Sequence, residues 1–80
     1  MDTLANIVKT KREKLGISQF KLAKDLGYTT PQFVSNFERE LAGIPLSKLK
    51  KLSKILKLST NEMRDALVSE YETEIKKALK

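Results

Sequence analysis

The sequence predicts a single all-α domain built from five helices. Apolar residues recur at helical spacing almost throughout the 80 residues, and no stretch alternates long enough to form a strand. Short segments rich in glycine, proline, serine and threonine separate these stretches and leave connections of about two to seven residues. A chain of this length has room for one core, so residues 1–80 are expected to form one compact helical bundle.

The first two helices have recognisable ends. The first is expected to begin near Asp2 or Thr3 and to stop at Gly16, because glycine readily takes the left-handed conformation just past a helix end. Ser18 can cap the second helix, "QFKLAKDL", and Gly27 then ends it. Each helix carries an apolar stripe expected to face the core: Leu4, Ile7, Val8 and Leu15 in the first, and Leu22, Ala23 and Leu26 in the second.

The third helix lies within "GYTTPQFVSNFERE", residues 27–40, and is expected to close near Glu40. Thr30 can cap it, and Pro31 suits its first position, where the missing N–H costs no hydrogen bond. Its apolar residues are expected to point inward: Val34, Phe37 and Leu41. Its polar residues are then left on the exposed face: Gln32, Ser35, Asn36 and Arg39.

The last two helices follow the loop "LAGIP". Ser47 can cap a fourth helix, and its apolar face is expected to be Leu49, Leu52, Ile55 and Leu56. Ser59 and Glu62 have the spacing of a capping box, so a fifth helix is expected from Thr60 to about residue 79. Apolar residues recur at every fourth position along it: Met63, Leu67, Tyr71, Ile75 and Leu79.

The composition argues against several classes of function. The chain has no cysteine and no histidine. It therefore lacks the side chains that most often bind metals and carry acid–base catalysis at neutral pH, and we expect no enzyme, metal or cofactor. No apolar run approaches the roughly 20 residues that span a bilayer, and the N-terminal "MDTLANIVKTKREK" is charged. A cytoplasmic protein without a membrane partner is expected.

The net charge of +6 is concentrated in the first three quarters of the chain. Residues 1–59 hold twelve Lys/Arg and five Asp/Glu, a balance of +7, whereas residues 60–80 hold four and five, a balance of −1. A basic excess placed in this way is typical of proteins that bind a polyanion such as nucleic acid. A solvated lysine-rich surface has the same composition, so charge alone leaves both interpretations open.

The second and third helices have the arrangement of a helix-turn-helix, in which the second helix lies in the DNA major groove. Only "GYTT" separates them, Ala23 is small where they would cross, and Gly27 can take the positive φ of a sharp turn. The exposed amides of Gln32 and Asn36 fit base reading, because an amide can pair with N6 and N7 of adenine together.

The stretch "KREKLGISQFKLAKDLG…FVSNFERE" resembles the helix-turn-helix domain of the XRE/Cro–cI family of prokaryotic and phage repressors. The likeness includes Arg12, the "LG-I-SQ" segment at residues 15–19, the "LA..LG" core at residues 22–27 and the pair Glu38–Arg39, and it extends over roughly residues 4–62. It implies a five-helix lambda-repressor-like DNA-binding domain. It also implies a nucleoid-associated transcriptional regulator, most often a repressor that binds a pseudo-palindromic operator in double-stranded DNA as a homodimer.

The resemblance also implies roles for individual residues. Arg12 and Glu38 match an internal salt bridge between the first and third helices, and Gln19 matches a glutamine that holds a phosphate and braces the first recognition residue. The residues expected to read base edges are Gln32, Phe33, Ser35 and Asn36. Those expected near the phosphate backbone are Lys11, Gln19, Thr29, Thr30, Arg39 and Lys48, the threonines and Lys48 by their location alone. Phe33 has a second interpretation, since it lies four residues before Phe37 and could share the core with it.

Two features depart from the family pattern. The turn is one residue longer, because Val34 comes seven residues after Gly27 and not six. Glu40 and Lys57 stand where a glycine commonly follows the third and fourth helices.

The fifth helix has two possible roles at its outer end. Tyr71, Ile75 and Leu79 continue the apolar stripe beyond what five short helices can cover, so they are expected either to form a two-fold dimer seam or to pack back on their own domain. The dimer is favoured. A function from another class remains open, namely an antitoxin or other helical interaction module whose C-terminal helix binds a different protein.

Overall fold

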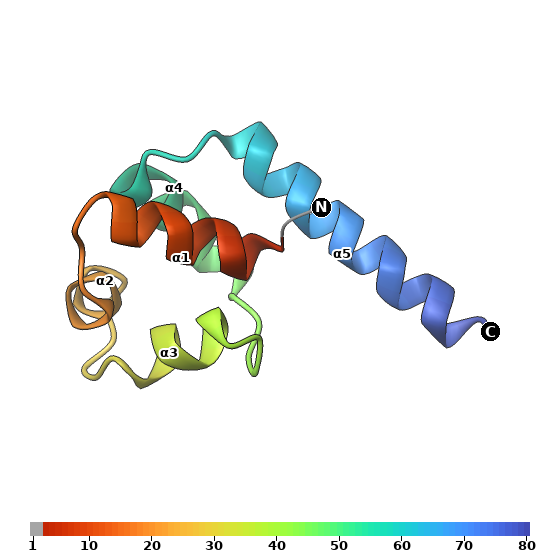
Figure 1. Ribbon diagram of the computed structural model, residues 1–80, viewed down its shortest axis with the longest axis horizontal. Coiled ribbons are helices and arrows are strands. Elements are labelled where there is room, and N and C mark those ends of the chain that lie inside the picture. The colour runs from red at the N-terminus through yellow and green to blue at the C-terminus, as the bar shows by residue number, and fades with distance from the viewer. Residues whose placement is uncertain (1–2) are drawn as a thin grey trace.

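The computed structural model describes residues 3–80, which form five α-helices and one short 3₁₀ helix, η1. Their bounds are α1 Leu4–Lys14, α2 Gln19–Asp25, α3 Gln32–Glu38, η1 Leu46–Lys48, α4 Leu49–Leu56 and α5 Thr60–Ala78. None of the described residues is in a strand, so the prediction of an all-α, five-helix domain is confirmed. α1 contacts α3, α4 and α5, while α2 packs on α3 (Figure 1).

Short polar side chains begin three of the helices. Thr3, Ser18 and Ser59 each accept a hydrogen bond from the backbone N–H three residues further on, which satisfies one unpaired donor of α1, α2 and α5. The start of α1 next to Thr3 matches the expectation, and Asp2 lies outside the described residues. At α5 the cap accepts from the N–H of Glu62, which is one half of the predicted capping box.

A residue in the left-handed conformation follows each of the first four helices. After α1 and α2 it is glycine, with φ of +71° at Gly16 and +95° at Gly27. After α3 and α4 it is Glu40, with φ of +62°, and Lys57, with φ of +55°. These are the two positions at which glycine was expected from the family pattern. A non-glycine residue there carries a steric cost of roughly 1–2 kcal/mol.

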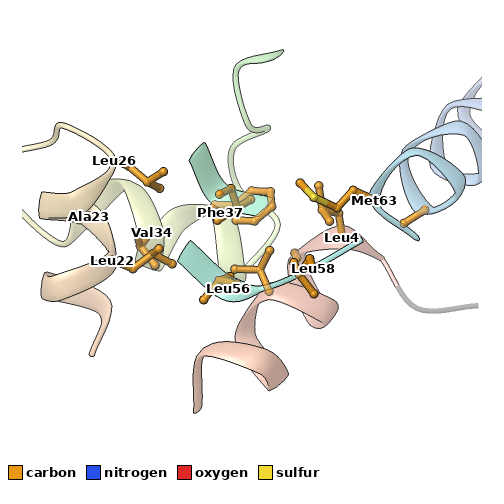
Figure 2. Packing of buried hydrophobic residues seen from close by; sticks show 13 residues of the cluster. Leu4, Leu22, Ala23, Leu26, Val34, Phe37, Leu56, Leu58 and Met63 are labelled. Carbon is orange, nitrogen blue, oxygen red and sulfur yellow. The ribbon is translucent and has the colours of Figure 1, made fainter. Parts of the chain in front are cut away.

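The core is one apolar cluster to which all five helices contribute (Figure 2). Its largest fully buried side chains are Leu4, Val8, Leu22, Leu26, Val34, Leu52 and Leu56. Figure 2 shows Phe37 and Met63 beside them, the latter bringing the first turn of α5 into the same cluster. The apolar stripes of α2 and α4 therefore face the core as predicted.

Three expectations about the ends of helices are wrong. Leu15 and Leu41 were expected to face the core. Leu15 is the C-cap residue of α1 and is 37% exposed, and Leu41 is 68% exposed. Leu41 follows the left-handed Glu40, so the chain has already left the helix and helical spacing no longer places Leu41 inward. Ser47 does not cap α4, because it lies inside η1, where the N–H of Lys48 donates to the carbonyl of Pro45 at 2.9 Å.

α5 belongs to the bundle only over its first half. Met63 and Ala66 are buried, and the side chain of Glu70 accepts a hydrogen bond from the N–H of Leu4 at 3.4 Å, at the start of α1. Beyond this point the helix runs away from the other four, and every residue from Tyr71 to Lys80 is exposed (Figure 1). None of the described helices is both long and apolar enough to cross a membrane.

Candidate nucleic-acid interface

A buried ion pair fixes α3 against α1. The carboxylate of Glu38 accepts from Arg12 Nε at 2.7 Å and from Arg12 Nη2 at 3.0 Å, the paired geometry in which arginine binds a carboxylate most strongly. A third bond comes from α2, where Gln19 Nε2 donates to Glu38 Oε1 at 3.0 Å. The remaining guanidinium nitrogen donates to the carbonyl of Ile17 at 2.8 Å. One carboxylate therefore joins three helices.

The charge of Arg12 is stable across the working pH range. The pKa of Arg12 is raised, chiefly by its hydrogen bond to Glu38, although burial lowers it. Because the folded-state pKa lies above the ordinary arginine value, the stability contributed by the arginine is fully present below that value and is lost only as pH rises through the raised one. Arg12 is thus a permanently charged structural residue.

The turn between α2 and α3 is fixed at its start. The N–H of Tyr28 donates to the carbonyl of Ala23 at 2.9 Å, and the left-handed Gly27 between them reverses the chain. Lys48 Nζ donates to the carbonyl of Leu26 at 2.8 Å, where a cation offsets the negative end of α2. Since Val34 is 1% exposed, the extra residue of the turn is absorbed without lifting α3 off the core.

The start of α3 differs from the prediction by one residue. α3 begins at Gln32, so Pro31, with φ −76° and ψ −3°, is its N-cap residue and not its first residue, and Thr30 is not the N-cap. The N–H of Gln32 donates to Thr30 Oγ1 at a long 3.4 Å. Thr29 and Thr30 are exposed in the turn directly before the helix. Their hydroxyls therefore lie at the edge from which α3 starts.

Phe33 packs within the protein. Its ring stacks on Tyr28, with centroids 4.4 Å apart, and lies nearly parallel to Phe37 at 6.3 Å. It is half-buried against the core cluster. Of the two interpretations left open by the sequence, the structure shows the packing one, because the ring stacks on Tyr28 and on Phe37. Lys48 adds a cation 5.3 Å above the Tyr28 ring.

The polar side chains of α3 form a hydrogen-bonded row. Gln32 Nε2 donates to Asn36 Oδ1 at 2.9 Å, and Arg39 Nη2 donates to the same oxygen at 2.9 Å. Gln32 and Arg39 are exposed, whereas Asn36 and the neighbouring Ser35 are half-buried. The row runs along one edge of the helix over its whole length. We call Gln32, Asn36 and Arg39 the polar row.

Not all residues expected near a phosphate backbone lie beside the polar row. Gln19 is bonded to Glu38, so Asn36 and not Gln19 supports the Gln32 side chain. Lys11 lines a shallow hollow of α1 together with Lys57 and Glu62, at the junction of α4 and α5. The structure therefore does not bring Lys11 to the exposed edge of α3.

Lysines gather on the other side of the turn. A shallow hollow over η1 and α4 is lined by Ser47, Lys48, Lys50, Lys51 and Lys54. Lys48 links this hollow to the end of α2 through its bond to Leu26. The sequence indicated that lysines cluster here, but it did not indicate that Lys48 contacts the end of α2. That contact depends on how the helices pack in three dimensions. The polar row, by contrast, has the i,i+4 and i,i+3 spacing that predicts such contacts.

The described residues contain no other site with a comparable arrangement. They hold no group of three or more acidic, histidine or cysteine residues placed to bind a metal. Every buried side-chain nitrogen or oxygen among them has a hydrogen-bond partner.

Comparison with known families agrees with this geometry. A family described as helix-turn-helix matches residues 8–63, which is 56 of the 80 residues and includes α2, the turn and α3. Searches of curated proteins and of solved structures found no significant match.

Proposed function

This chain belongs to the helix-turn-helix family, as a DNA-binding regulator of the XRE/Cro–cI type, and we propose that it is a repressor that binds a pseudo-palindromic operator as a homodimer. One recognition helix reads few base pairs, so a second copy is needed to reach useful specificity. Repression then follows from occupying a promoter, with no chemistry by the protein. Such a regulator acts at the chromosome, in the cytoplasm of a prokaryotic cell.

The polar row carries this proposal. Asn36 Oδ1 accepts from both neighbours, so it holds the amide of Gln32 in one orientation. A primary amide has two N–H groups and one carbonyl oxygen, and only one N–H of Gln32 is used in the row. The second N–H and the oxygen remain for adenine N7 and N6, the pairing that distinguishes adenine in the major groove. We therefore assign Gln32 as the main base reader and Asn36 as its support and as a donor.

Positive charge around the turn supplies affinity without sequence choice. Arg39 ends the polar row, and the lysines over η1 and α4 flank the turn. Thr29, Thr30 and Ser35 add hydroxyls at the same edge of α3. Phosphate contacts of this kind position a protein on the duplex and make its affinity fall steeply with salt. Because the buried Arg12–Glu38 pair fixes α3, these contacts set where Gln32 meets the bases.

A selection from random or genomic DNA tests the proposal. We would run it at about 150 mM salt with competitor DNA, so that general charge attraction is suppressed. The expected result is an enriched motif of two inverted half-sites about one helical turn apart. A folded protein that enriches no motif would contradict the proposal and leave the basic surface as general attraction.

A second candidate function concerns the outer half of α5. Tyr71 and Leu79 are 66% and 81% exposed, a surface that a different protein could also cover, as in an antitoxin that represses its own promoter. The two candidates differ in oligomeric state. Analytical ultracentrifugation of the purified protein should show a homodimer if the first is right. A monomer that becomes stable only with a co-purified partner would favour the second.

A further inference from the structure

The outer half of α5 extends beyond the bundle, and of its residues Glu74 lines a hollow shared with α1 and the loop after α3. All ten residues from Tyr71 to Lys80 are exposed, yet they continue a regular helix to Ala78. Most helical stability in proteins comes from packing of an apolar face, and the apolar residues of this half are exposed. In Figure 1 this half extends away from α1, α2, α3 and α4.

One face of this half is apolar. Val68, Tyr71, Ile75 and Leu79 are spaced by three, four and four residues, which places them within about 80° of one another around the helix. Their exposed fractions are 49%, 66%, 41% and 81%. We call these four residues the α5 stripe. Its spacing is that of a short seam between two helices.

The charges on either side of Ile75 have opposite sign. The preceding turn contains Glu70, Glu72 and Glu74, and the following residues contain Lys76, Lys77 and Lys80. Two copies packed in parallel would set acidic turn beside acidic turn and basic beside basic. Of these charges, Glu72 and Lys76 border the stripe, and two copies packed antiparallel, with their two-fold axis near Ile75, would set Glu72 of each copy beside Lys76 of the other. The antiparallel pairing also opposes the two helix dipoles.

We infer that the α5 stripe pairs with the stripe of a second copy in antiparallel orientation, about a two-fold axis near Ile75. Glu72 and Lys76 lie one turn apart on the same edge of the stripe. In an antiparallel pair the same edges of the two helices meet, so each Glu72 lies beside the Lys76 of the other copy. Glu74 is on the other side, in a hollow lined by its own bundle.

The length of α5 supports this arrangement. From Ile75 back to Ala66 is nine residues and to Met63 is twelve, or about 14 and 18 Å at 1.5 Å per residue. The two-fold axis doubles these distances, so the two bundles are anchored about 27–36 Å apart along the paired helices. The paired helices therefore hold two separate bundles, each with its own α3 available for one half-site. The inference rests on the proposed homodimer and specifies how it is built.

Disulfide cross-linking of single-cysteine variants tests the orientation, and the natural chain contains no cysteine to interfere. We would prepare Tyr71→Cys and Leu79→Cys, oxidise each alone and mixed, and identify dimers by mass. In an antiparallel pair residue 71 faces residue 79 of the other copy, whereas residue 71 lies about 12 Å from its own equivalent. A disulfide needs Cα atoms within about 7 Å. The mixture should therefore cross-link, as heterodimers, and neither variant alone should.

Thr73→Cys is the matched control, because Thr73 is also exposed on α5 but lies off the stripe. Thr73→Cys should not cross-link, and any disulfide that it does form gives the background from chance collision. If Tyr71→Cys alone cross-links with itself, the pairing is parallel and the inference is wrong. If no variant cross-links although circular dichroism shows folded protein, the stripes do not pair. In that case the DNA selection, which contains no cysteine variant, still decides the proposed function on its own.

Discussion

Replacing Arg12 by methionine should remove a large part of the stability of this protein. Arg12→Met keeps most of the side-chain volume but deletes two of the three hydrogen bonds that the Glu38 carboxylate accepts. The side chain of Glu38 is 3% exposed, so water cannot replace them. Removing one partner of a buried pair costs about 3–5 kcal/mol, because the other charge stays buried.

The expected loss of stability is large compared with the total free energy of unfolding. A domain of 80 residues has a free energy of unfolding of about 4–12 kcal/mol. Arg12→Met should therefore shift the urea unfolding midpoint strongly and can leave part of the protein unfolded at 25 °C. The double variant Arg12→Met/Glu38→Leu removes both charges, so it should recover most of the loss. Gln19, which is only half-buried, can turn to water in the double variant.

Urea unfolding followed by far-UV circular dichroism measures these differences. All variants must be compared at one protein concentration, since a dimer makes stability depend on concentration. Lys21→Met is the matched control: Lys21 pairs with Asp25 at 3.0 Å, but with side chains 63% and 33% exposed, and should cost less than about 0.5 kcal/mol. The reasoning is refuted if Arg12→Met costs no more than Lys21→Met, or if the double variant is as unstable as the single one.

Three further outcomes are expected. Gln32→Ala should lose discrimination at one position of each half-site, by about 1–3 kcal/mol, when the DNA selection is repeated; an unchanged motif would contradict base reading by Gln32. Arg39→Ala should lower the slope of log affinity against log salt by about one per subunit, whereas Lys11→Ala, away from the polar row, should leave it unchanged. Glu40→Gly and Lys57→Gly should each raise the free energy of unfolding by about 0.5–1 kcal/mol, because glycine relieves the left-handed strain; a lower urea midpoint would contradict this.

The helices could be predicted from the sequence because local rules set where they begin and end. Ser18 and Ser59 cap helices as expected, and Gly16 and Gly27 take the positive φ that ends α1 and α2. Such features depend only on a few neighbouring residues, so they can be predicted from a single sequence. The same holds for the polar row, because each of its two contacts joins side chains about one turn apart on the helix.

Contacts between elements were harder to predict. Gln19 was expected to brace Gln32, but α2 packs so that its amide reaches Glu38. Lys48 was expected near phosphate, and its ammonium donates to the end of α2. Both side chains are long and polar, and either role satisfies their hydrogen bonding. Only the packing of the helices decides which partner is within reach.

The apolar stripe of α5 shows how one spacing rule produces two surfaces. A step of four residues turns about 400° around a helix, so each successive residue of the sequence stripe moves about 40° further round. Met63 faces the core, and Leu67, one step on, is half-buried. By Tyr71 the stripe has turned about 80° from Met63, and it leaves the bundle where the bundle itself ends. The apolar residues that the sequence placed on one helix face therefore form two surfaces. The first half of the sequence stripe closes the domain, and its second half is turned outward, where the proposed second copy would pack.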